Sequence, residues 1–475
     1  MIYAHFTWLD WLPVAAYGLY LIYALTRRRP GTEGYLIADR SLGLWTFTAT
    51  LVATWYGGIL GPSEFTYRYG LANWTTQGLP YYIFAILFAV FLATKVRAAT
   101  LYTIPDKLEM AYGRSAALVG AVCAFLIANP ATYVLMLGIL ISSLFGIPLL
   151  AAMIVGVIVS LVYVFYGGFQ ADVRINFVQF LLMFAGFALL LPFCWRDIGG
   201  FHAIQTHLPP PLLTFTGGND WGYLIVWFFV ALWTLVDPGF HQRCYAARKP
   251  QIARNGILLA VLCWFTFDCM TTLAGLYARV ATPHLSDAQA KFAYLALAEQ
   301  VLPPAVKGFF YVGLLAPVMS AMMSYTFIGA MTIGRDFVWR LKGDTNNDRI
   351  PLYTRYGLIV TALIATAIAA MVPSIVQQWF AVGTVFVPGL LIPLLTAYTE
   401  KWKVKEVYAT LGIVAGSGVA LACLLFGWLN HGIFADTSQF PFGIQPMYSG
   451  LIASLIVYLT GLLNRHHSRR LASAG

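Results

Sequence analysis

Long apolar stretches alternate with short polar connections along the whole chain. A helix needs roughly 20 apolar residues to cross the hydrocarbon layer of a bilayer, and thirteen stretches approach or exceed that length. They lie near residues 9–26, 43–72, 79–95, 116–145, 148–166, 175–195, 222–246, 255–281, 305–334, 354–373, 377–398, 406–429 and 446–464. The pattern therefore predicts an all-α polytopic membrane protein, a single domain over residues 1–475 with about thirteen transmembrane helices.

Basic side chains are unevenly distributed over the connections. All but five of the 29 lysines and arginines fall in every second connection, and the exceptions are Arg68, Arg196, Arg279, Lys291 and Lys307. The basic connections include Arg27, Arg28 and Arg29 after the first span, Arg243 and Arg248 after the seventh, and Arg469 and Arg470 after the last. Because basic connections stay in the cytoplasm, we expect an integral protein of the cytoplasmic membrane with its N-terminus outside and its C-terminus inside.

Composition narrows the class further. Hydrophobic residues make up 60% of the chain and charged residues 10%, which is more apolar surface than a soluble domain can bury. The net charge of +10 does not indicate nucleic-acid binding, because the basic residues lie between apolar spans. The six cysteines lack metal-ligand spacing, and the sequence shows no phosphate loop or nucleophile–base pattern. We therefore expect no enzyme, no ATP-driven pump, no organic cofactor and no obligate protein partner, the lipid bilayer aside.

Three spans contain residues that interrupt helices. The second has Gly57-Gly58 and Gly61-Pro62, the seventh has Asp237-Pro238-Gly239, and the ninth has Pro317. Irregular backbone at membrane depth is tolerated only where it lines a cavity or is buried in protein. If residues 43–195 and 222–398 are inverted repeats, the second and seventh spans are their first helices. Paired interruptions at corresponding positions predict a substrate site between them.

Ionisable residues inside spans are the next candidates, because burying them in hydrocarbon is costly. Glu64 has Arg68 one turn later, so an ion pair and a site role are both open. Asp237 stands at the seventh-span interruption, and Asp268 has no basic neighbour at helical spacing. A cross-helix hydrogen bond of protonated Asp268 is the alternative to a site role. With the polar and aromatic residues beside the expected cavity, the candidate substrate-binding residues are Tyr56, Glu64, Gln77, Trp233, Asp237 and Asp268.

Five stretches in order, over roughly residues 35–340, resemble the sodium:solute symporter family. They are Tyr35 to Leu42 (YLIADRSL), Tyr67 to Leu71 (YRYGL), Gly167-Gly168 with Ala171-Asp172-Val173 and Gln179, Asp237 to Arg248 (DPGFHQRCYAAR), and Met319-Ser320 with Ser324-Tyr325 and Gly334 to Phe337. The resemblance implies a LeuT-type core of five plus five helices, with one extra N-terminal helix (9–26) and two extra C-terminal helices (406–464). It also implies secondary active symport of a small organic solute by alternating access, coupled to sodium.

The resemblance further implies ion sites. The principal Na⁺ site of the family would use the carbonyls of Ala53, Tyr56 and Pro317 and hydroxyls at positions 320 and 321. Ser320 supplies one hydroxyl, whereas Ala321 supplies none. A second cation site, found in some members, would use an aspartate where this chain has Asn176 and serines where it has Met323 and Ser324, so that set is incomplete.

The driving ion and the solute stay open at this stage. Water could replace the missing oxygen at position 321, or protons on Glu64 or Asp268 could take over the coupling. Sodium-independent transport and a transporter-like membrane sensor are further alternatives. The lysine that the sugar transporters of the family carry falls near Trp264, which argues against a hexose.

Overall fold

The computed structural model describes the backbone of residues 3–25, 31–343, 346–432 and 439–474. Arg27, Arg28 and Arg29 lie outside these residues, and so do the side chains of Arg469 and Arg470. In this part of the chain the architecture is helical, and its only β-type pairing is an isolated bridge between Leu42 and Ala247. The predicted all-α class is confirmed.

The first half of the chain follows the predicted apolar segments. Its helices are α1 (Trp8–Leu25), α2 (Thr32–Ile37), α3 (Leu44–Trp55), α4 (Leu60–Tyr69), α5 (Leu79–Leu87), α6 (Ala93–Ala98), α7 (Ile104–Tyr112), α8 (Arg114–Ile127), α9 (Ala131–Phe145), α10 (Leu149–Asp197) and α11 (Phe201–His207). The long helix α10 contains two predicted spans that meet at Gly168, whose φ of +54° bends the backbone. Only glycine adopts such a conformation freely.

The second half contains the helices α12 (Trp221–Val230), α13 (Trp233–Val236), α14 (Pro238–Ala246), α15 (Pro250–Ala281), α16 (Ala293–Val301), α17 (Val306–Met331), α18 (Arg340–Lys342), α19 (Ile350–Met371), α20 (Ile375–Thr396), α21 (Glu406–His431) and α22 (Pro446–Ala474). Within the described residues, ten helices are long and apolar enough to cross a membrane. The interruption between α3 and α4 leaves neither half long enough by itself. The count of thirteen spans stays a prediction.

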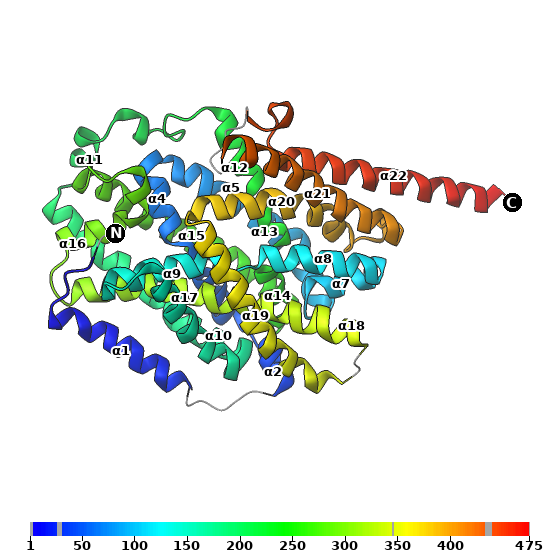
Figure 1. The fold of residues 1–475 in the computed structure, drawn as a ribbon, viewed down its shortest axis with the longest axis horizontal. Coiled ribbons are helices and arrows are strands. Elements are labelled where there is room, and N and C mark those ends of the chain that lie inside the picture. Colours follow the sequence, from blue (N-terminus) through cyan, green and yellow to red (C-terminus); the bar gives the residue numbers. More distant parts are fainter. Residues whose placement is uncertain (1–2, 26–30, 344–345, 433–438, 475) are drawn as a thin grey trace.

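Helix α17 forms the centre of the bundle and packs against α1, α3, α9, α10 and α19. Figure 1 shows α17 and α10 side by side, with α1 at one edge and α22 running along the opposite one. Small residues permit the close packing. A Cβ atom added at Gly313 would lie 3.2 Å from the Cα atom of Gly186 and 3.0 Å from the carbonyl oxygen of Leu182.

The predicted interruptions are partly confirmed. The second span breaks at the 3₁₀ turn η2 (Tyr56–Gly58), between α3 and α4. The seventh breaks between α13 and α14 at Asp237, whose backbone is extended. The prediction of a break at Pro317 is wrong, because α17 continues through it. The helix tolerates this proline because the amide it lacks leaves only one carbonyl without its usual partner.

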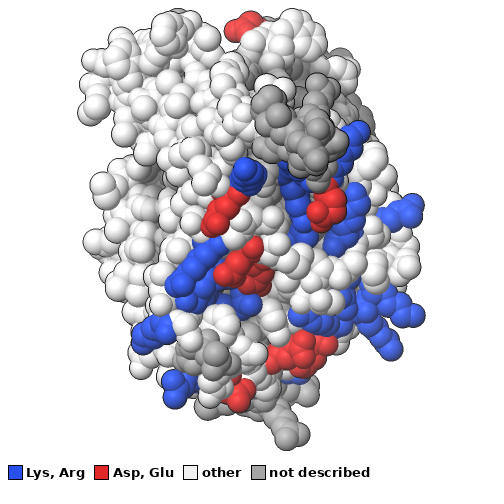
Figure 2. Space-filling view, turned by 90° about the vertical axis from the view of Figure 1, so that its right-hand side faces the viewer, with Lys and Arg blue, Asp and Glu red and all other residues white. Residues whose placement is uncertain are grey.

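Charged side chains gather at one end of the bundle. Figure 2 shows lysine and arginine concentrated on the face at the right of Figure 1, where α7, α8 and α18 lie. The positive-inside prediction requires such clustering, although which side of the membrane this end faces remains a prediction. Arg243, predicted to lie in a cytoplasmic connection, is instead completely buried, because α14 extends through it to Ala246.

Candidate functional site

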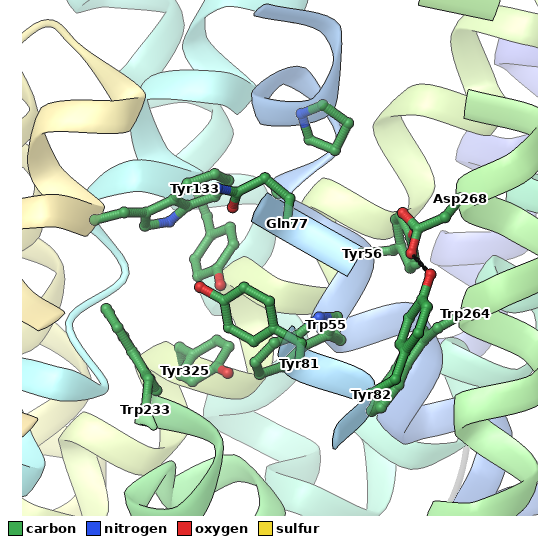
Figure 3. A pocket seen from close by; sticks show the side chains of 13 residues that line it. Trp55, Tyr56, Gln77, Tyr81, Tyr82, Tyr133, Trp233, Trp264, Asp268 and Tyr325 are labelled. Atoms are coloured by element: carbon green, nitrogen blue, oxygen red, sulfur yellow. Dashed lines mark hydrogen bonds between the residues drawn. The ribbon is translucent and has the colours of Figure 1, made fainter. Parts of the chain in front are cut away.

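A cavity that is partly open to solvent lies beside the two interrupted helices, with about 790 Å³ of empty space when that solvent is included. The residues that line the cavity come from α3, η2, α4, η3 (Trp74–Gly78), α5, α9, α13, α15, α17 and α20, and Figure 3 shows how their side chains converge. Its lining comprises Trp55, Tyr56, Gly58, Pro62, Gln77, Tyr81, Tyr82, Tyr133, Trp233, Trp264, Asp268, Tyr325 and Trp379.

Asp268 supplies the carboxylate of the cavity. It lies on α15 and is only 4% exposed. The hydroxyl of Tyr56 donates to one of its oxygens and the hydroxyl of Tyr82 donates to the other. The structure therefore brings Asp268 and Tyr56 together, and Gln77 and Trp233 line the same cavity; their role in substrate binding stays a prediction.

Asp237 lies behind the cavity wall. It caps α14 by accepting a hydrogen bond of 3.0 Å from the backbone amide of Phe240, which satisfies one of the free donors at a helix start. Its second oxygen accepts from Trp233 Nε1 at 3.0 Å and from the hydroxyl of Tyr325 at 2.9 Å. Because both rings line the cavity, Asp237 orients wall residues, although it is not itself part of the lining.

Glu64 is placed differently from the other acids. Its carboxylate lies 3.3 Å from the guanidinium of Arg68, one turn later in α4. It does not belong to the lining of the cavity. Of the two readings that the sequence leaves open, the structure shows the ion pair.

The glycines of the interruption make room for neighbouring helices. A Cβ atom added at Gly58 or Gly61 would lie 2.6 Å or 2.3 Å from the indole of Trp379 on α20. A Cβ atom at Gly57 would lie 2.8 Å from the carbonyl oxygen of Pro317 and 2.0 Å from the Cβ atom of Ala321. The absence of side chains at these positions lets Trp379 close one wall of the cavity and brings α17 against the interruption.

The proposed ligands of the first Na⁺ site adjoin this contact. The Pro317 carbonyl faces Gly57, and Ser320 Oγ lies 3.3 Å from Thr54 Oγ1. Ala321 presents only its methyl group to the interruption. The backbone at η2 and this face of α17 thus meet where the family resemblance places a cation.

A buried ionic cluster lies next to these residues. The Arg243 guanidinium donates to Thr54 Oγ1 at 2.7 Å and to Ser324 Oγ at 2.9 Å, and it lies 3.7 Å from the Asp172 carboxylate. Ser324 in turn donates to Asp172 at 2.7 Å, and Asn176 Nδ2 lies 3.5 Å from Ser324 Oγ. Asn176 and Ser324, the predicted remnants of a second cation site, do come together, and the cation beside Ser324 is the Arg243 guanidinium.

Several of these residues escape the sequence analysis. Tyr81, Tyr82, Tyr133, Tyr325 and Trp379 line the cavity, yet tyrosine and tryptophan are too frequent in this chain to stand out. Asp172 precedes Asn176 by one helical turn, so the two side chains lie on the same helix face. That spacing could have identified Asp172 as a further member of the buried cluster. Nothing in the sequence pattern indicates that Arg243 turns inward.

A second cluster of charges joins α7 to α18 and to η7 (Thr332–Trp339), the helical segment that follows α17. Asp106, buried near the start of α7, accepts a hydrogen bond from Arg335 and another of 2.8 Å from Arg340. Burial opposes ionisation of Asp106, but the two guanidinium groups outweigh it and hold the pKa of that carboxyl below its usual value. These bonds hold α7, which connects α6 to α8, against α18.

Comparison with known proteins agrees with this architecture. A sequence profile described as the sodium:solute symporter family matches residues 35–403. The sodium/pantothenate symporter of Escherichia coli (strain K12) is 25% identical over 486 residues, covering 95% of this chain and 95% of that protein. The sodium/glucose cotransporter of Vibrio parahaemolyticus is 26% identical, covering 91% of this chain and 84% of that protein.

A solved structure supports the fold. That structure, a Na⁺-coupled sialic acid symporter in a substrate-bound outward-open state, matches with a TM-score of 0.74 at 14% identity, over 96% of this chain and 97% of that chain. At that identity the likeness concerns the fold alone, and the predicted LeuT-type fold is confirmed. The profile covers well over half of the sequence. The chain therefore belongs to the sodium:solute symporter family.

Proposed function

We propose that this protein is a secondary active transporter that couples the entry of a small organic solute to Na⁺ by alternating access. The observation that carries the proposal is the position of the cavity, which lies beside two interrupted helices and close to the oxygens of Pro317 and Ser320. Interrupted helices expose carbonyls that can hold a cation close to the solute. Solute and ion can then favour the same conformation, which is the physical basis of symport.

The Na⁺ would bind the carbonyls of Ala53, Tyr56 and Pro317 and the hydroxyl of Ser320. Oxygen ligands suit a hard cation, and the bare Gly57 lets both helices approach it. Ala321 contributes no oxygen, so a water molecule would complete the shell. We assign one Na⁺ to each transport cycle, because Arg243 already supplies positive charge beside Asp172 and Ser324.

The solute would bind in the aromatic cavity. Tyr56, Gln77, Trp233 and Asp268 would contact it directly, and Asp237 would hold Trp233 and Tyr325 in place. Glu64 would not contact the solute, because it pairs with Arg68 outside the cavity. The orientation that we propose places the N-terminus outside the cytoplasmic membrane and the C-terminus in the cytoplasm.

Uptake by the purified protein in liposomes tests the proposal. Labelled solutes from several chemical classes are offered under an inward Na⁺ gradient and, at the same pH, under an equal K⁺ gradient. We expect at least one solute to accumulate only with Na⁺. Equal uptake in Na⁺ and K⁺ that instead follows an imposed proton gradient would contradict Na⁺ coupling and favour protons carried by the buried Asp268.

A further inference from the structure

We infer that the solute is an organic cation, a protonated or quaternary amine that also carries a hydrogen-bond acceptor. The inference rests on the proposed function, because it takes the aromatic cavity to be the solute site. Charge, ring geometry and unpaired donors support it separately.

The charges around the cavity are negative. Asp268 lines it, and Asp237 lies directly behind Trp233 and Tyr325. None of the described residues in the lining is a lysine or an arginine. Arg243 lies behind the cavity wall near Asp237 and Tyr325 and also contacts Asp172, Thr54 and Ser324, so it balances those acids without lining the cavity. A carboxylate solute would thus face Asp268 with no basic residue in the lining to pair with, whereas a cation would neutralise Asp268.

The remaining walls consist of aromatic faces. Trp55 packs at 5.3 Å from Tyr81 and at 5.6 Å from Trp264, measured between ring centroids, and Tyr133 stacks on Tyr325 at 5.3 Å. In Figure 3 Tyr133, Tyr325 and Trp233 lie across the space from Asp268, whereas Trp264 lies on the same side as Asp268. Ring faces attract cations, and cages of this kind bind quaternary ammonium groups.

Two donors define the rest of the solute. Within the described residues, the Gln77 Nε2 and Trp264 Nε1 atoms are buried and have no hydrogen-bond partner, although both residues line the cavity. Leaving a buried donor unpaired is costly, so a bound solute is expected to offer it an oxygen. In an ammonium compound with a hydroxyl, ether or carbonyl oxygen a few bonds away, the cation would pair with Asp268 and the oxygen would accept from these donors.

Matched probes can separate charge from shape. Choline and its uncharged isostere 3,3-dimethylbutan-1-ol have nearly the same volume and share the hydroxyl, so only the charge distinguishes them. Binding of each to the purified full chain in Na⁺ buffer is measured by calorimetry, with tetramethylammonium and phenethylamine as further cations. We expect at least one of the three ammonium probes to bind, and choline to bind at least about tenfold more tightly than its isostere.

Two sets of variants assign the effect to the cavity. Asp268→Asn should weaken ammonium binding at least about tenfold, whereas Asp197→Asn, which removes an acid from an exposed ion pair, should leave it unchanged. Tyr81→Phe keeps the ring face and should bind ammonium as before, and Tyr81→Leu should not. Retained circular dichroism and elution volume show that each variant is folded.

The outcomes also distinguish this inference from the proposed function. No binding of any ammonium probe, equal binding of the uncharged isostere, or full binding by Asp268→Asn would overturn the inference. If an anionic or neutral solute is instead taken up with Na⁺, the symport proposal stands and the inference fails. If no solute of any class depends on Na⁺, the symport proposal itself fails.

Discussion

At the residue scale, the buried charges of the core have two kinds of partner. Asp172 and Arg243 pair with one another, whereas Asp268 and Asp237 are held by tyrosine and tryptophan donors. The first arrangement neutralises charge inside the protein. The second places the Asp268 carboxyl group in the cavity wall, where an incoming solute can contact it.

The Na⁺ site can be tested by adding an oxygen. Ala321→Ser places a hydroxyl beside Gly57 and the Pro317 carbonyl, so it should lower the Na⁺ concentration for half-maximal transport by up to about tenfold, the effect of about 1.4 kcal/mol. Ser320→Ala should raise it by a similar factor. The exposed Ser115→Ala serves as a control. If Ala321→Ser and Ser320→Ala both leave the Na⁺ dependence unchanged, the cation does not bind there.

The ionic cluster predicts a non-additive double mutant. Arg243→Met alone leaves the Asp172 charge without its partner in the core, and Asp172→Asn alone leaves the Arg243 charge without its partner. Each variant should destabilise the protein by about 3–5 kcal/mol. The double variant should cost less than the sum of the two. Unfolding in detergent monitored by intrinsic fluorescence measures all three. Strictly additive losses would show that the two side chains do not interact.

At the scale of elements, the interruptions show what sequence can and cannot predict. The Gly57-Gly58 and Asp237-Pro238 signals both correspond to real breaks, because each combines two residues of low helix propensity. At the second break the Asp237 carboxylate also accepts a hydrogen bond from a freed backbone amide. Pro317 lacks a second breaking residue, and the helix passes through it. The turn between α8 and α9, at Ala128 to Pro130, was not predicted although it contains a proline. Tertiary packing decides between these cases, and a single sequence does not display it.

The packing of Trp379 on α20 against the interruption between α3 and α4 can be tested by adding a methyl group at Gly61. Gly61→Ala would place a methyl group 2.3 Å from the Trp379 indole, and such overpacking costs about 1–3 kcal/mol. Displacing Trp379 should reduce solute affinity about tenfold. Combining Gly61→Ala with Trp379→Leu should recover part of the loss. Gly418→Ala, which meets nothing within 4 Å, is the matched control. Normal binding by Gly61→Ala would show that Trp379 does not shape the cavity.

The contact of α7 with η7 and α18 has a definite pH dependence. Because Arg335 and Arg340 lower the pKa of Asp106 below 3.8, its stabilisation is complete above that pH and disappears as the pH falls through the lowered value. Asp106→Asn should therefore destabilise the protein by about 1.5–3 kcal/mol. Asp336 lies against the same two guanidinium groups, and burial together with Asp106 raises its pKa, so the difference also changes as Asp336 titrates near neutral pH. The part that belongs to Asp106 itself should disappear only below about pH 4. Thermal unfolding from about pH 8 to about pH 3 measures both parts, and a difference that remains undiminished at about pH 3 would contradict the assignment.

At the scale of the whole molecule, the sequence predicts the class better than the site. Hydrophobic length and the alternation of basic connections predict a polytopic helical protein, because the bilayer constrains both strongly. The family resemblance predicts the LeuT-type fold, which the structural likeness confirms. The cavity is harder to predict, because its walls come from helices far apart in the sequence, such as α5, α9 and α20. Arg243 illustrates the limit, since a basic residue near a span end reads as a surface charge until the packing is known.

The number of Na⁺ ions that accompany each solute molecule is the most direct test of the mechanism. It is measured in proteoliposomes by finding the membrane potential at which solute flux stops at several Na⁺ gradients. We predict one Na⁺ per solute, because the described residues offer one set of oxygens, near Pro317 and Ser320, while Arg243 supplies the positive charge beside Asp172 and Ser324. A ratio of two would contradict the role given to Arg243. A ratio of zero would contradict Na⁺-coupled symport.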